Sequence, residues 1–104
     1  MGPVIIEEPR IDSLIMNEEI FGPILPLVSY HDLDELISFI NSKPKPLAVY
    51  HFSENHKNIE KVRRNTFSGA YCLNDAVIFV LNTKLPFGGV GKSGYGRWSG
   101  KSGY

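Results

Sequence analysis

The sequence predicts an α/β fold, a mainly parallel sheet with flanking helices, and three observations carry this prediction. Short runs rich in branched and aromatic residues alternate with two amphipathic helical patterns. The connections between them are short, which favours right-handed parallel crossovers. Glycine is concentrated at the end of the chain, where seven of the ten glycines lie after position 87. A Gly-rich, irregular tail is therefore expected after Leu85.

Five segments have the length and composition of strands. In chain order they are Val4–Ile6, Leu25–Tyr30, Leu47–Phe52, Gly69–Leu73 and Ala76–Leu81. Pro26 has no backbone N–H, so the strand that contains it should lie at a sheet edge or begin its pairing late. The run Val77–Leu81 contains no polar residue, and both of its faces therefore require cover in the folded protein.

Two segments carry apolar stripes at helical spacing. In the first, residues 32–43, the apolar positions follow an i, i+3, i+4, i+7 pattern. Asp32 and Glu35 resemble a capping box at its start, and Pro44 should end it. The second, residues 55–66, carries a thinner apolar stripe beneath a basic outer face, which is typical of a helix packed on a surface.

Composition excludes several classes of protein. The chain has 104 residues, 42% of them hydrophobic, and a formal net charge of zero, which fits a globular domain and gives no basic stripe for nucleic acid. No apolar run is long enough for a membrane-spanning helix, so no membrane segment is expected. The single cysteine, Cys72, cannot form an internal disulfide, and this favours a reducing, intracellular and cytoplasmic setting.

Several candidate sites are outweighed by simpler interpretations. The three histidines lack the paired spacing of metal ligands, so no metal site is predicted. Cys72 lies in an apolar run, and we expect a buried structural thiol rather than a nucleophile. The segment Gly89–Gly94 satisfies the dinucleotide pattern G-x-G-x-x-G, but the residues after it are broken by glycine and do not predict the helix that such a loop requires.

Two segments are less easily explained as structure alone. Glu18–Pro23 places a carboxylate and an aromatic ring before a Gly-Pro turn, and Leu85–Gly94 places another aromatic ring in a glycine loop. With Ser68–Asn74 between them, they resemble three motifs of the aldehyde dehydrogenase superfamily, in the same order. Lys45–Tyr50 is most similar to the class 3 and fatty aldehyde branch. The resemblance implies that residues 1–104 are the C-terminal part of a catalytic domain.

The resemblance also implies a reaction and a set of site residues. The reaction is oxidation of an aldehyde to a carboxylic acid, with NAD or NADP as hydride acceptor. Glu19 matches the glutamate that binds the nicotinamide ribose, and Phe21 matches the aromatic residue beside the nicotinamide. Asn74 matches an asparagine near the active site, and Phe87 matches a wall of the substrate channel. A carboxylate can accept two ribose hydroxyls, and aromatic rings supply apolar area, so the residue types suit these roles.

The same family uses a cysteine nucleophile, a glutamate base and a dinucleotide-binding domain that match nothing in this sequence, and Cys72 is not at the nucleophile position. No catalytic residue is therefore assigned, and we expect the chain alone to be inactive and to bind the dinucleotide weakly or not at all. A homo-oligomer is expected. The alternative is a self-associating interaction module derived from a truncated dehydrogenase, which would form a stable oligomer without binding dinucleotide.

Overall fold

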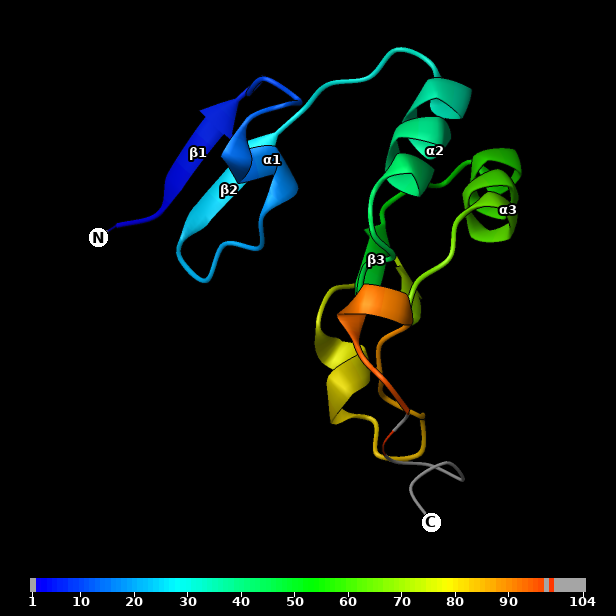
Figure 1. The fold of residues 1–104 in the computed structure, drawn as a ribbon. Coiled ribbons are helices and arrows are strands. Elements are labelled where there is room, and N and C mark those ends of the chain that lie inside the picture. Colours follow the sequence, from blue (N-terminus) through cyan, green and yellow to red (C-terminus); the bar gives the residue numbers. More distant parts are fainter. Residues whose placement is uncertain (1, 97, 99–104) are drawn as a thin grey trace. The chain divides into compact units, whose positions relative to one another are not determined.

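The computed structural model describes residues 2–96 and 98, and the chain forms two compact units, Met1–Leu33 and Asp34–Tyr104 (Figure 1). We call them the N-terminal and C-terminal units. Both are built from strand, crossover and parallel strand, so the predicted α/β class is confirmed.

The N-terminal unit consists of β1 (Val4–Glu7), α1 (Leu14–Asn17) and β2 (Ile24–Leu27). The two strands pair in parallel, with Pro26 opposite Ile6. No third strand joins this pair among the described residues, so Pro26 lies on an edge strand, as its missing N–H predicts. The short helix α1 was not predicted from the sequence.

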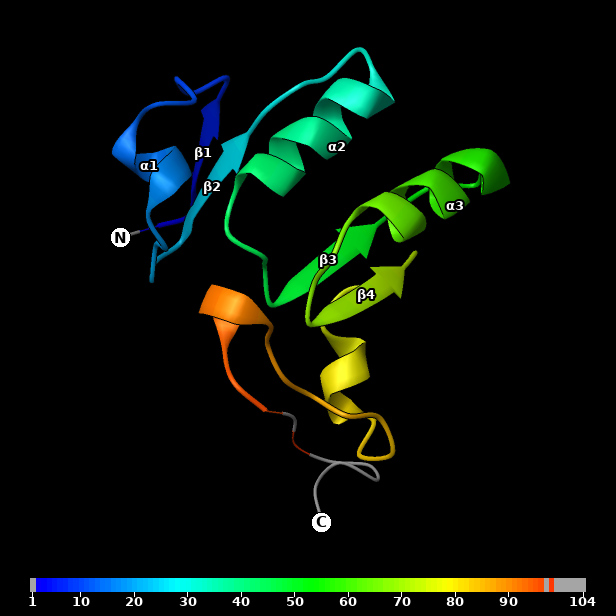
Figure 2. The same cartoon turned by 45° about the vertical axis from the view of Figure 1, so that its right-hand side comes forward.

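The C-terminal unit begins at the second residue of α2 (Leu33–Ser42) and continues with β3 (Ala48–His51), α3 (His56–Asn65) and β4 (Ala70–Leu73). The two helices agree with the predicted ranges to within one residue at each end. Strands β3 and β4 lie side by side and pair in parallel, with α3 as the crossover between them (Figure 2). Asn55 caps α3, because its side-chain oxygen accepts the N–H groups of Lys57 and Asn58 at 3.0 and 3.2 Å.

The sheet is divided differently from the prediction. The sequence suggested a continuous parallel layer in which the segments on either side of residues 32–43 belong together. Instead, β1 pairs only with β2 and β3 only with β4 among the described residues. Strand pairing depends on contacts between distant parts of the chain, and the local sequence pattern does not contain that information.

The predicted strand Ala76–Leu81 is wrong. Residues Ile78–Leu81 form a 3-10 helix, η1, in which the Val80 N–H donates to the Val77 carbonyl at 3.0 Å. Asn74 and Val77 adopt positive φ angles of 55° and 66°, and these two left-handed residues turn the chain out of the line of β4. The apolar run is exposed, so the cover that it requires is not supplied by the described residues.

The most buried side chains of the described residues belong to the two long helices. They are Ile37 of α2 with Ile59 and Val62 of α3, between 5% and 8% exposed. A hydrogen bond from Asn41 Nδ2 to the Asn65 carbonyl, 2.7 Å, also links these helices. Ile37, Ile59 and Val62 each belong to the apolar stripe that predicted their helix, so the stripes correctly identified the core.

The end of the C-terminal unit is irregular, as predicted. Its described residues include a short 3-10 helix, η2 (Gly91–Ser93), and an isolated antiparallel bridge between Phe87 and Trp98. The predicted tail also includes residues 97 and 99–104, which lie outside the described residues.

Candidate functional site

The carboxyl ends of β3 and β4 are joined by Asn74. Its side-chain oxygen accepts the Ser53 N–H at 2.8 Å, and its Nδ2 donates to the Ser53 carbonyl at 3.0 Å. Its own N–H donates to the His51 carbonyl at 2.7 Å. Asn74 therefore continues the pairing of the two strands by one further step through its side chain. Ligands of open parallel sheets bind beyond this end of the strands, which makes it the candidate site of the C-terminal unit.

One face of the β3–β4 pair carries a tyrosine and a histidine. A 2.6 Å hydrogen bond joins His51 Nδ1 to the Tyr71 hydroxyl, and the rings meet edge to face with centroids 6.0 Å apart. Burial raises the pKa of the Tyr71 hydroxyl above its usual value, against a smaller lowering by Arg63 of α3. Because Arg63 and Glu60 of α3 act electrostatically on Tyr71, this is the face nearest α3.

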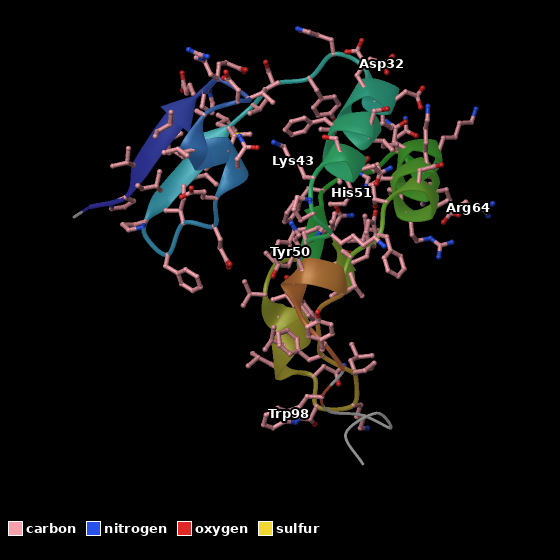
Figure 3. All side chains as sticks on the ribbon, viewed as in Figure 1. Asp32, Lys43, Tyr50, His51, Arg64 and Trp98 are labelled. Atoms are coloured by element: carbon pink, nitrogen blue, oxygen red, sulfur yellow. The ribbon has the colours of Figure 1, made fainter. Side chains whose placement is uncertain are left out.

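The opposite face carries a series of aromatic ring contacts. Tyr50 precedes His51 in β3, and because successive side chains of a strand point to opposite faces, its ring lies on the other face (Figure 3), 6.2 Å from that of Phe79 in η1. The Phe79 ring lies 6.0 Å from that of Phe87, which is half-buried. Phe87, predicted as a wall of the substrate channel, thus belongs to an apolar cluster with Tyr50 and Phe79. Cys72 lies opposite Tyr50 in the ladder and is half-buried, not fully buried as predicted.

The glycine loop that follows Phe87 returns to the start of β4. An added Cβ at Gly69 would lie 2.2 Å from the Gly88 carbonyl oxygen and 3.0 Å from Gly89 Cα. Val90 and Ser93 close the loop, since the Val90 N–H donates to Ser93 Oγ at 2.8 Å. Among the described residues the loop opens only the three-residue η2, whereas a phosphate-binding loop opens a longer helix.

Glu19 and Phe21 lie in the N-terminal unit, between α1 and β2. Both side chains are exposed, and Phe21 is 93% exposed. Neither forms a hydrogen bond, ion pair or ring contact with any residue that the structure describes. An exposed carboxylate and an exposed ring two residues apart are available to a ligand, which is compatible with the predicted pair of cofactor contacts.

No hydrogen bond or ring contact joins any two of the predicted site residues among the described part of the chain: Asn74 binds Ser53, whereas Phe87 contacts Phe79. Asn74 and Phe87 belong to the C-terminal unit, and Glu19 and Phe21 to the N-terminal unit. Sequence reasoning missed Ser53, Tyr50 and Phe79. Ser53 contributes its backbone, which leaves no signal in its side chain, whereas the aromatic runs around Tyr50 and Phe79 were visible but were assigned to strands. The described residues contain no cluster of three potential metal ligands and no helix of the length and hydrophobicity that crosses a membrane.

Replacing Asn74 by alanine should destabilise the C-terminal unit by about 2–4 kcal/mol, because two hydrogen bonds are lost and alanine must adopt a left-handed conformation. Asn74→Gly also removes the amide, but glycine tolerates the positive φ. The free energy of unfolding should therefore fall by about 1 kcal/mol less in this variant than in Asn74→Ala. Urea unfolding of the 104-residue chain, followed by circular dichroism at one protein concentration, measures both. Equal stability of the alanine variant and the parent chain would contradict the role of the amide.

Comparison with known proteins gives one consistent result. The model of the aldehyde dehydrogenase family matches residues 1–104. Aldehyde dehydrogenase family 3 member F1 of Arabidopsis thaliana is 50% identical over 99 residues, which are 95% of this chain and 20% of the relative. The predicted similarity to the class 3 branch is therefore confirmed.

Solved structures agree. AldH of Staphylococcus aureus, in a substrate-bound state, is 48% identical with a TM-score of 0.88, over 95% of this chain and 22% of that one. A mutant of aldehyde dehydrogenase C from Pseudomonas syringae, in complex with NAD+ and octanal, is 30% identical with a TM-score of 0.82. The match covers 95% of this chain and 20% of that one. The chain spans about a fifth of the length of the relatives that it matches.

Proposed function

The chain belongs to the aldehyde dehydrogenase family, and on that premise we propose that it is the C-terminal segment of the catalytic domain of an NAD(P)-dependent aldehyde dehydrogenase. The reaction is oxidation of an aldehyde to a carboxylic acid, in which the nicotinamide, when bound, accepts the hydride. The single observation that carries the proposal is the family match over all 104 residues.

Glu19 and Phe21 are proposed as the contribution of this segment to the cofactor site. The exposed Glu19 carboxylate, without a partner among residues 2–96 and 98, has oxygens available to accept the hydroxyls of a ribose. The Phe21 ring, 93% exposed, offers an apolar face to a flat heterocycle. These proposed roles suit NAD and NADP equally, because the nicotinamide and its ribose are the same in both cofactors.

Asn74 and Phe87 are proposed to serve the aldehyde side of the site. Both polar atoms of the Asn74 amide already bind the Ser53 backbone, so its contribution is to hold the two strand ends together. Phe87 is packed against Phe79 and supplies part of an apolar wall. Aldehydes with apolar chains suit such a wall, since their burial requires no polar partner. The unpaired Cys72 fits the reducing environment of the cytoplasm, which we propose as the location.

A segment exchange tests the proposed function. This chain replaces the matched segment of Staphylococcus aureus AldH, and we call the product the chimera. Aldehyde-dependent NADH or NADPH production should stay within about ten-fold of the host enzyme, since most of the reacting groups are unchanged. The 104-residue chain by itself should give no turnover, because no activated thiolate is identified in it.

Two controls define the result of this exchange. The host enzyme without the matched segment should be inactive, which establishes that the segment is needed. Circular dichroism and thermal unfolding establish that the chimera is folded. A folded chimera that produces neither NADH nor NADPH would contradict the proposed function.

A second candidate function, self-association without catalysis, is favoured by one observation. Val77, Ile78 and Leu81 are between 58% and 80% exposed and adjoin strands that have unpaired edges among the described residues. Such a surface is covered most simply by a second copy around a twofold axis. Sedimentation of the chain over a wide concentration range distinguishes the candidates, because a well-folded 11.7 kDa monomer at high concentration would exclude the interaction module.

A further inference from the structure

The segment Glu18–Pro23 is held at its two ends. At the α1 end, the Glu18 N–H donates to the Leu14 carbonyl at 2.9 Å. At the β2 end, the Pro23 carbonyl accepts the Val4 N–H at 2.8 Å. Glu19 and Phe21, between these points, have no hydrogen bond or ring contact with the described residues. The position of both side chains therefore depends on how firmly the two ends of the segment are fixed.

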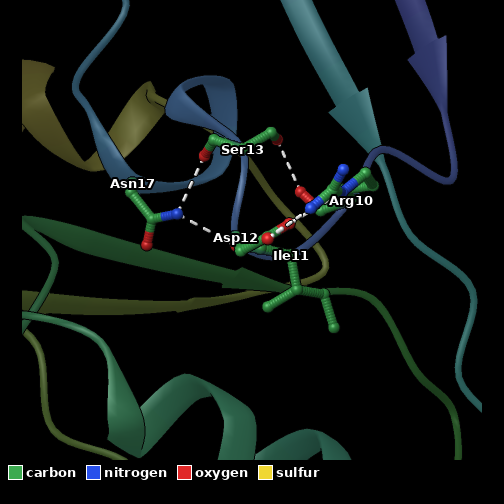
Figure 4. Close-up of polar contacts among 5 residues, drawn as sticks. All are labelled: Arg10, Ile11, Asp12, Ser13 and Asn17. Atoms are coloured by element: carbon green, nitrogen blue, oxygen red, sulfur yellow. Dashed lines mark hydrogen bonds and ion pairs between the residues drawn. The ribbon is translucent and has the colours of Figure 1, made fainter.

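The α1 end depends on Asn17. Helix α1 has only four residues, too few to be stable without further contacts. The Asn17 amide uses both of its N–H donors on the turn before the helix: Nδ2 donates to the Ile11 carbonyl at 2.9 Å and to the Ser13 carbonyl at 2.8 Å (Figure 4). Asn17 thus ties the last residue of the helix to two carbonyls of the turn that precedes its first residue.

The turn itself is closed by neighbouring side chains. Ser13 Oγ donates to the Arg10 carbonyl at 2.5 Å, and the Arg10 guanidinium binds the Asp12 carboxylate through two hydrogen bonds of 3.0 and 2.6 Å (Figure 4). The Arg10–Asp12 pair is exposed and contributes little to stability. The bonds of Asn17 are the ones that join this turn to the end of α1.

We propose that Asn17 is a positioning residue for Glu19; this inference rests on the cofactor role proposed for Glu19. The chain leaves α1 at Glu18 in an extended conformation, with φ −118° and ψ 149°, so the direction of Glu19 follows directly from the end of the helix. Without the Asn17 amide, α1 frays and the Glu18 anchor is lost. Asn17 acts through the backbone and contacts neither cofactor nor aldehyde in this scheme.

Kinetics of the chimera test the inference first. Asn17→Ala should raise the KM for the dinucleotide about ten-fold, while the KM for the aldehyde stays within about two-fold. Asn17→Asp keeps the shape but places acceptor oxygens against two carbonyls, and it should be as harmful as alanine. Asn17→Gln keeps the donors and should recover part of the loss. A matched control is Asn65→Ala, which removes a 2.7 Å bond from Asn65 Nδ2 to the Lys61 carbonyl in α3 and should leave the dinucleotide KM unchanged.

A double-mutant cycle separates positioning from general stability. If Asn17 acts through Glu19, then Asn17→Ala should raise the KM for the dinucleotide about ten-fold in the parent chimera. In the Glu19→Gln chimera the same substitution should raise that KM less than about two-fold. Equal losses in both backgrounds would overturn the inference. If Glu19→Gln raises the KM for the dinucleotide and Asn17→Ala leaves it unchanged, this inference is overturned and the proposed function stands. If Glu19→Gln leaves this KM unchanged, the proposed role of Glu19 is lost, and this inference with it.

A measurement without cofactor provides an independent result. A protease that cleaves after glutamate should cut the Asn17→Ala chain after Glu18 or Glu19 several-fold faster than the parent chain, because the segment is released from α1. Cleavage after Glu54, an exposed residue of the C-terminal unit, should not change and serves as the internal reference. Unchanged cleavage after Glu18 and Glu19 would contradict the inference even if the enzyme variant proved difficult to assay.

Discussion

Replacing Gly69 by alanine is expected to unfold the C-terminal unit. A Cβ at this position would lie 2.2 Å from the Gly88 carbonyl oxygen, 2.6 Å from the Leu47 carbonyl oxygen and 3.0 Å from Gly89 Cα. All three atoms belong to backbone, so no side-chain rotation can relieve the overlap. Relief requires the start of β3, the start of β4 and the glycine loop to separate.

This separation would also cost backbone hydrogen bonds. The Gly69 N–H donates to the Pro46 carbonyl at 3.1 Å, and the Ala70 N–H donates to the Leu47 carbonyl at 2.9 Å. We expect Gly69→Ala to lower the free energy of unfolding by more than about 3 kcal/mol, which places it among the most damaging single substitutions. Only three side chains are buried in the part of this unit that the structure describes, so it has little stability in reserve.

Circular dichroism and urea unfolding of the 104-residue chain measure the effect, and the soluble yield of the corresponding chimera provides a second readout. The matched control is Gly22→Ala, because an added Cβ there would meet only Ile20 Cγ2 at 3.9 Å, an ordinary contact. The free energy of unfolding of the Gly22→Ala variant should lie within about 0.5 kcal/mol of that of the parent chain. Gly69→Ala with the same urea midpoint as this control would show that the close approach of the three segments is not maintained in solution.

The helices were predictable because their signals are local. The apolar stripes that contain Ile37, Ile59 and Val62 set the buried faces, and the capping residue Asn55 and the proline after α2 set the ends. The short α1 gave no such signal. It depends on the bonds of Asn17 and Ser13 to nearby carbonyls, and a sequence pattern does not reveal these.

The errors have a common physical origin in non-local structure. The residues of Ala76–Leu81 have strand propensity, but strand propensity expresses packing against neighbours, and here the left-handed Asn74 and Val77 direct the run away from β4. The division into two separate strand pairs likewise depends on which strands meet in space. Residue patterns predict the type of an element better than they predict its partners.

The candidate site was predicted from motif resemblance, and the structure adds what the residue types could not. Nothing in the side chain of Ser53 indicates that its backbone receives both polar atoms of Asn74. Nor does the spacing of Tyr50, Phe79 and Phe87 along the chain predict that the Phe79 ring contacts both of the others. Such relations arise from turns, and turns at positive φ are the part of this fold least evident in its sequence.

Glu19→Gln in the chimera is expected to lower kcat/KM for the dinucleotide by about 10- to 150-fold, which corresponds to about 1.5–3 kcal/mol for a charged hydrogen-bond acceptor. The amide keeps the size of the side chain but loses the charge and one acceptor oxygen, so the ribose hydroxyls are held less firmly. Because a loosened nicotinamide affects the step that transfers hydride, the loss should appear in that step more than in capture of the aldehyde.

Stopped-flow measurement of NADH formation, combined with titration of the dinucleotide, separates these contributions. Glu18→Gln is the matched control, because it changes the adjacent exposed carboxylate in the same way. Glu18 has extended backbone angles, and successive side chains of extended backbone point in opposite directions, so Glu18 should face away from a ligand bound by Glu19. Glu18→Gln should therefore retain activity within about two-fold. Equal losses in the two variants would assign the effect to the overall charge of the segment, and unchanged kinetics in Glu19→Gln would remove Glu19 from the cofactor site.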